Sequence, residues 1–172
     1  MERAASALIP QRSNGLRGVN FGEISEMLSV DLPGDYKELA NCYPTLEFDD
    51  FLRVPLPTPG RERVFVEGVF RELEILRDIQ EAGMAEEYVA HPEPGGLIPW
   101  SESLSGDVFY WRVFGADPDG WPVVVNSRND EWWEFPGGAI AFLVGIMDGT
   151  IEMRGLPPRT PGLNPRVRVF TD

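Results

Sequence analysis

The clearest pattern in the chain is a helical repeat of apolar residues between residues 66 and 82. The apolar positions, spaced three and four apart as on one face of an α-helix, are Val66, Val69, Phe70, Leu73, Leu76 and then Ile79 or Gln80. Glu67 and Arg71 form a favourable i, i+4 pair on the outer side. Gly83 is suited to end the helix, so we expect a long amphipathic helix here.

Three shorter segments carry the same helical spacing. Two of them lie between residues 22 and 43, separated by Leu32 and Pro33, because proline disfavours helical backbone in the residue before it and suits the first turn of a new helix. The third ends at Gly149, which suits a C-cap. The apolar stripes that define them are Ile24, Met27 and Leu28; Tyr36, Leu39 and Ala40; and Ala139, Phe142, Leu143, Ile146 and Met147.

A period of two replaces the helical period between residues 97 and 135, which predicts an antiparallel meander. Residues 97–100 are extended, and the next strand alternates, with Phe109, Trp111 and Val113 on one face and Val108, Tyr110 and Arg112 on the other. "GADPDG" and "NSRND" have the composition of turns. They set off a strand that begins at Trp121 and another at 132–135.

Two weaker strands complete the expected fold. Residues 51–57 form a short strand that their prolines confine to a sheet edge or cut off, and residues 167–170 can add a last strand. The predicted class is α+β, with a central, mainly antiparallel sheet flanked by helices. We expect one domain over residues 1–172, a mobile N-terminus over about 1–20 and an irregular, proline-rich tail over about 155–172.

The formal net charge of −13 makes nucleic acid a poor partner, because phosphate contacts need clustered basic residues. Basic protein surfaces suit this chain better. No apolar run approaches the roughly 20 residues of a membrane helix, and the N-terminal apolar stretch is too brief for a signal peptide. We therefore expect no membrane partner and a cytoplasmic location.

The residue types that usually carry catalysis are scarce. With one cysteine and one histidine, neither an internal disulfide nor a Cys/His metal site can form. Cys42 is expected to be a small buried thiol and His91 a surface imidazole, although each could act as a nucleophile or a base. Four pairs of acids could bind a cation or cleave glycosides, but none has regular ligand spacing. They are Asp49 with Asp50, Glu86 with Glu87, Asp117 with Asp119, and Asp130 with Glu131. We expect a non-enzyme without cofactor or metal.

Several local patterns, in their order along the chain, are similar to those of the SUKH superfamily. They run from about Ile24 to Leu156 and comprise "LPGDYKEL", "GGLIPW", "SGDVFYWRVFGADPDGWPVVV", "WWEF" and "AIAFLVGIMDG". The superfamily includes a fungal regulator of cell-wall synthesis, of the Smi/Knr type, and many bacterial immunity proteins. The chain departs from it at "CYPTLEF", where members commonly have glycine, and in the connection that holds the helix at 66–82.

The resemblance implies an α+β domain in which Asp107 fixes the start of a strand through local hydrogen bonds. It also implies a bacterial immunity protein that binds and blocks a cognate toxin, such as a nuclease or another enzyme acting on nucleic acid. An acidic inhibitor suits the basic cleft of such a toxin. The alternatives are a scaffold or regulatory module related to the cell-wall regulators and an enzyme that uses paired carboxylates.

The candidate partner-binding residues combine acidic turns with one aromatic side chain. An exposed tryptophan within an acidic rim would give an interface an apolar anchor surrounded by charge. Each acid could equally be an ordinary solvated turn residue. The residues that we expect to contact the partner are Asp117, Asp119, Asp130, Glu131 and Trp132.

Overall fold

The computed structural model describes residues 1–129, 131–158 and 160–171. Its centre is a seven-stranded sheet in the order β6-β5-β4-β3-β2-β1-β7, and every neighbouring pair is antiparallel. The strands are β1 (Thr45–Phe48), β2 (Leu52–Val54), β3 (Leu97–Ser103), β4 (Val108–Arg112), β5 (Val123–Asn126), β6 (Trp132–Phe135) and β7 (Val167–Phe170). The expected α+β class with a central antiparallel sheet is therefore confirmed.

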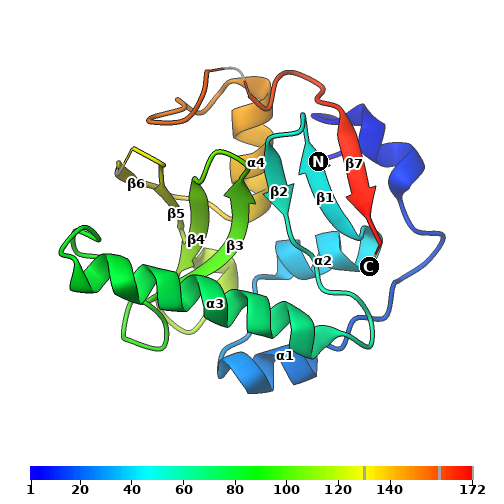
Figure 1. Ribbon diagram of the computed structural model, residues 1–172. Helices are drawn as coiled ribbons and strands as arrows, with labels where there is room; N and C mark the ends of the chain where they lie inside the picture. Colours follow the sequence, from blue (N-terminus) through cyan, green and yellow to red (C-terminus); the bar gives the residue numbers. More distant parts are fainter. Residues whose placement is uncertain (130, 159, 172) are drawn as a thin grey trace.

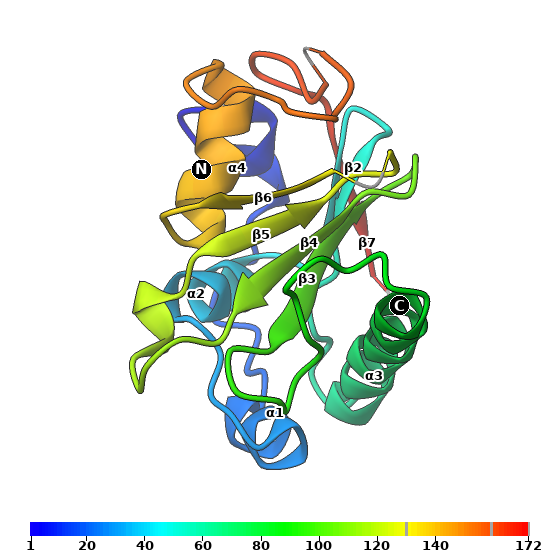
Figure 2. The ribbon, with the colours of Figure 1, turned by 90° about the vertical axis from the view of Figure 1, so that its left-hand side faces the viewer.

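Helices cover both faces of the sheet (Figures 1 and 2). Figure 2 shows α2 and α4 on one side and α3 on the other, with α1 packed beside α3. The helices are α1 (Phe21–Leu28), α2 (Gly34–Cys42), α3 (Glu62–Glu81) and α4 (Ala139–Asp148), with short 3-10 turns η1 (Ser6–Gln11) and η2 (Pro118–Gly120). Among the described residues, no helix has both the length and the apolarity to cross a membrane.

The core between α4 and the sheet is built from aromatic rings. Phe142 of α4 is fully buried, and its ring centroid lies 5.5 Å from that of Phe109 and 5.7 Å from that of Phe135. Trp100 and Trp133 complete the cluster. Gly149 ends α4 with a left-handed backbone at φ 77°, as its sequence position predicts.

Strand β4 alternates as predicted. Phe109 and Trp111 face the α2 and α4 side, where Trp111 meets Tyr36 of α2 edge to face at 4.8 Å. Tyr110, which lies between them in the sequence, faces the α3 side and stacks on Trp132 with 6.1 Å between the ring centroids. The stretch from Ser105 to Val113 is thus a central strand with aromatic side chains packed on both of its faces.

Asp107 holds the tight connection between β3 and β4. Its carboxylate is fully buried and accepts hydrogen bonds from the Ser103 hydroxyl and from the Arg128 backbone N–H, the latter at 2.9 Å. Gly106, at φ 96°, supplies a backbone conformation that other residues avoid. The expected role of Asp107 in fixing the start of the strand is confirmed.

The first strand, β1, was not predicted, and the second follows one of its two predicted outcomes. It lies between β1 and β3 and not at an edge. Its pairing with β3 covers only Leu52 and Arg53, and the strand ends at Val54, directly before Pro55. Proline therefore cuts the strand short and leaves it inside the sheet.

The N-terminal segment packs against the sheet edge formed by β7 (Figure 1). It contains the short helical turn η1, with Ala5 and Leu8 buried. The backbone N–H and the hydroxyl of Ser6 both donate to Asn164 Oδ1, at 2.8 Å and 2.7 Å. These contacts join the segment to the irregular stretch that precedes β7.

Candidate functional site

The predicted partner-binding residues lie at two opposite ends of the sheet. Asp117 and Asp119 lie in the β4–β5 connection, whereas Glu131 and Trp132 lie where the β5–β6 turn runs into β6. In an antiparallel meander, successive connections fall at opposite ends of the shared strand. A single rim containing all of these residues was therefore a wrong prediction. Asp130, the remaining candidate, lies outside the described residues.

Asp117 and Asp119 act within the fold. The Asp117 carboxylate accepts a hydrogen bond from the backbone N–H of Asp119 at 3.1 Å. The Asp119 carboxylate accepts one from the Gly34 N–H at 2.5 Å, at the start of α2. A carboxylate at a helix N-terminus satisfies an otherwise unpaired donor and opposes the positive end of the helix dipole. Although both side chains are exposed, they join the η2 turn to α2.

Trp132 fastens the loop that follows α3. Its ring stacks on Tyr88 at a centroid distance of 4.9 Å, and its indole N–H donates to the Met84 carbonyl at 3.1 Å. The indole is partly buried, with one ring face against Tyr88. It therefore positions the loop while keeping part of its surface accessible.

This contact gathers exposed acids that are distant in sequence. Glu86 and Glu87 lie on the loop after α3, and Glu134 lies on β6, on the same face as Trp132; all three are exposed. We call Glu86, Glu87, Trp132 and Glu134 the acidic-aromatic patch. Glu131 is also exposed, but its carboxylate lies beside Gly155, on the opposite face of the sheet.

Tyr88 and Arg112 connect the two halves of the patch. The pKa of Tyr88 is raised to about 12, first by burial and then by the charges of Glu134 and Glu87, against the opposite effect of Arg112. Arg112 lies 5.6 Å from the Tyr88 ring centroid and pairs with Glu134 at 2.5 Å. One arginine thus offsets part of the negative charge on the patch.

The other candidate groups are structural. Cys42 is buried, as predicted. The prediction of a surface His91 is wrong: its ring is buried, and Nε2 lies 2.8 Å from the Leu28 carbonyl oxygen. Asp49 accepts from the backbone N–H groups of Gly162 and Arg166, so it anchors the segment before β7. Within the described part of the chain, no three His, Cys, Asp or Glu side chains are placed to hold a metal ion.

Comparison of the chain with protein-family models, with curated proteins and with solved structures finds no match. The acidic-aromatic patch and its surroundings are therefore the features of this chain that bear on function.

Replacing Trp132 with alanine is expected to loosen the loop over residues 84–88. The change removes the stacking on Tyr88 and the hydrogen bond to Met84, so amide hydrogen exchange in this loop should quicken. Because the indole is only partly buried, the free energy of unfolding should fall by about 1–2 kcal/mol, less than for a fully buried tryptophan. Trp132→Phe, which keeps a stacking ring, should show a smaller effect. Unchanged exchange in the alanine variant would contradict the fastening role.

Proposed function

We propose that the chain is a SUKH-type immunity protein that binds a basic toxin acting on nucleic acid and blocks its active site. The observation that carries the proposal is the acidic-aromatic patch, in which exposed carboxylates on β6 and on the loop after α3 accompany an indole held by Tyr88 and Met84. Toxins of this kind need a basic cleft to hold phosphates, so an acidic inhibitor gains electrostatic steering and complementarity. The net charge of −13 extends the same attraction over the whole molecule.

The arrangement of the patch favours binding of a partner protein. Trp132 and Tyr88 are held by stacking and by a hydrogen bond, so little side-chain freedom remains to be lost on association. Aromatic anchors within a polar rim are typical of the residues that dominate protein interfaces. Of the acid pairs considered for catalysis, Asp49 with Asp50 and Asp117 with Asp119 are engaged in hydrogen bonds or ion pairs of the fold.

The test is capture of partners from lysate of the source organism by the tagged protein, at low and high salt. A captured protein is identified by mass spectrometry, produced separately and assayed on DNA and RNA. We expect a basic protein with nucleic-acid-directed activity that the wild-type chain inhibits stoichiometrically. Salt should weaken the complex strongly, because exposed charges beyond about 8–10 Å are screened at physiological ionic strength.

Two charge-matched variants locate the interface. The patch variant carries glutamine at Glu86, Glu87 and Glu134, and the control carries it at Glu26, Glu38 and Glu67, all exposed. The patch variant should inhibit about 10- to 100-fold less well, while the control should lose far less. Equal losses would show that only net charge matters and would overturn the assignment of the patch. Capture of a cellular enzyme or assembly factor with weak salt dependence would overturn the immunity proposal in favour of a scaffold.

A further inference from the structure

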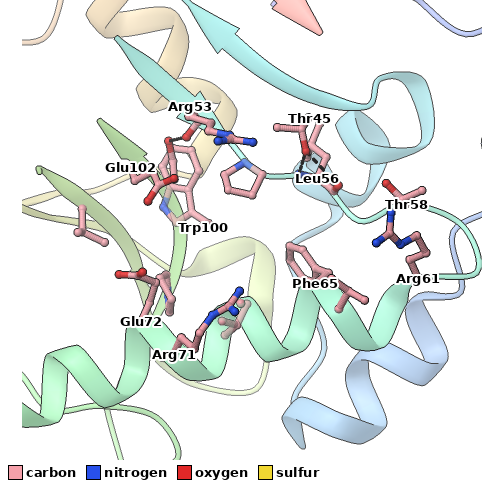
Figure 3. A pocket seen from close by; sticks show the side chains of 17 residues that line it. Thr45, Arg53, Leu56, Thr58, Arg61, Phe65, Arg71, Glu72, Trp100 and Glu102 are labelled. Carbon is pink, nitrogen blue, oxygen red and sulfur yellow. Dashed lines mark hydrogen bonds between the residues drawn. The ribbon is translucent and has the colours of Figure 1, made fainter. Parts of the chain in front are cut away.

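A cleft separates α3 from the face of the sheet that α3 crosses (Figure 3). Its volume is about 270 Å³, somewhat below that of sites for drug-sized ligands. The apolar part of the lining comes from Phe65 and Val69 of α3 and from Pro55 and Pro99 of the sheet side. Val64 at the rim is 48% exposed, so the cleft opens to solvent along α3.

A row of alternating charges crosses four strands of the sheet and ends at the cleft. Arg168, Glu47, Arg53 and Glu102 are directly opposed in register across β7, β1, β2 and β3. Arg168 reaches Glu47 at 3.8 Å, but Arg53 makes no ion pair with Glu102 among the described residues. Its guanidinium lies over the Phe170 ring, 5.1 Å from the centroid, and Figure 3 shows it directed away from the Glu102 carboxylate. Glu102 is left to face the cleft.

A second carboxylate faces the cleft from α3. Burial raises the pKa of Glu72, and the negative charge of Glu102 raises it further. Figure 3 shows both carboxylates at the same end of the cleft. Two partly buried carboxylates that repel each other are stabilised by a cation placed between them.

The remainder of the cleft is basic. Arg53, Arg61 and Arg71 all line it, and none of them makes an ion pair within 4.0 Å in the part of the chain that the structure describes. The guanidinium group matches a carboxylate through two parallel hydrogen bonds. Three such groups around one small cavity are unexpected in a chain that has 15 basic and 28 acidic residues.

We propose that this cleft binds a small zwitterion with an apolar body, of the chemistry of an apolar amino acid or dipeptide. The ligand's ammonium group lies at Glu72 and Glu102, its carboxylate meets Arg71, and its side chain rests on Phe65 and Val69. The site is separate from the acidic-aromatic patch and does not depend on the proposed toxin.

The test is titration of the ¹⁵N-labelled protein, followed by NMR. The probes are L-leucine and L-leucyl-L-leucine, with N-acetyl-L-leucine and L-leucinamide as controls that lack one charge each. We expect saturable shifts at cleft residues with a zwitterion, and binding at least about tenfold weaker for both controls, because each loses a charge-assisted interaction. The tighter of the two zwitterions identifies the source as an amino acid or a dipeptide.

Variants assign each end of the ligand. Glu72→Gln should weaken leucine binding and leave binding of N-acetyl-L-leucine unchanged, whereas Arg71→Gln should spare L-leucinamide. The matched controls are Glu74→Gln and Arg63→Gln on the same helix, which do not line the cleft. If no saturable shifts occur up to about 10 mM ligand, the dissociation constant is too high for specific binding. That result would overturn the proposal. Equal affinity for leucine and its two singly charged analogues would do the same.

Discussion

Replacing Phe142 with alanine is expected to lower the free energy of unfolding by about 3–5 kcal/mol. The ring is fully buried and lies within 5.5–6.2 Å, between centroids, of Phe109, Phe135, Trp133 and Trp100. Its loss leaves a cavity between α4 and the sheet that four large rings cannot readily fill. Denaturant unfolding, followed by tryptophan fluorescence, measures the change.

The matched control is Phe114→Ala. This phenylalanine is 73% exposed, so its truncation should change stability by less than about 0.5 kcal/mol. Phe142→Leu, which keeps most of the volume, should fall between the two. A cost below about 1 kcal/mol for Phe142→Ala would show that α4 does not depend on this aromatic cluster.

Replacing Asp107 with asparagine is expected to lower the free energy of unfolding by about 1–3 kcal/mol, although the two side chains have nearly the same shape. The Ser103 hydroxyl donates to the Asp107 carboxylate. The same hydroxyl oxygen already accepts from the backbone N–H groups of Ser105, at 3.1 Å, and Asp107, at 3.0 Å. Both of its lone pairs are thus engaged, and an asparagine NH₂ group turned toward it finds no acceptor.

Turning the asparagine amide around does not restore the lost hydrogen bond. If the asparagine oxygen faces Ser103, its NH₂ group meets the Arg128 N–H, which is also a donor. Asp117→Asn is the control, because that carboxylate is exposed and accepts a single hydrogen bond at 3.1 Å. Thermal and denaturant unfolding measure both changes. Wild-type stability in Asp107→Asn would show that the buried hydrogen bonds of this turn are dispensable.

The sequence predicted the helices well, because their signal is local. The spacing around Leu73 predicted α3, and Gly149 marked the end of α4. The predicted start of α3 was late, since the helix begins with Glu62 and Arg63, ahead of Val66, the first residue of the apolar repeat. Glu62, in its first turn, is buried and accepts a hydrogen bond from the Asn20 N–H at 2.9 Å, a long-range contact that no local pattern indicates.

The half of the sheet formed by β2, β1 and β7 was harder to predict than the helices. Strand β1 has only four residues, so the alternation of polar and apolar residues in "TLEF" is too short to be distinctive, and its polar residues Thr45 and Glu47 are buried as well. Glu47 is covered by its neighbours, including Arg168 of β7 at 3.8 Å. Arg168 lies on the last strand in sequence, about 120 residues after β1. The order of the strands depends on such long-range pairings. The prolines of residues 51–57 therefore left two outcomes open, an edge position or a strand cut short, and only the pairing with β1 and β3 decides between them.

The candidate site was only partly predictable. Alternation in "WWEF" places Trp132 and Glu134 on one face of β6, and Glu134 could have been added on that ground. The neighbouring loop could not, because the contact of Trp132 with Tyr88 joins residues 44 positions apart. The prediction that Asp117 and Glu131 share one rim was wrong, because the turns before and after β5 lie at opposite ends of that strand.

The pairing of β1 with β7 has a consequence for synthesis. Residues 45–48 meet their partners at 167–170, so β1 leaves the ribosome about 120 residues before the strand that covers its outer edge. At about 5–20 residues per second this interval lasts about 6–24 seconds. A nascent chain can build the meander from β3 to β6 meanwhile, but it carries an open backbone edge on β1. Stalled or truncated translation products would therefore be prone to sticking together through that edge.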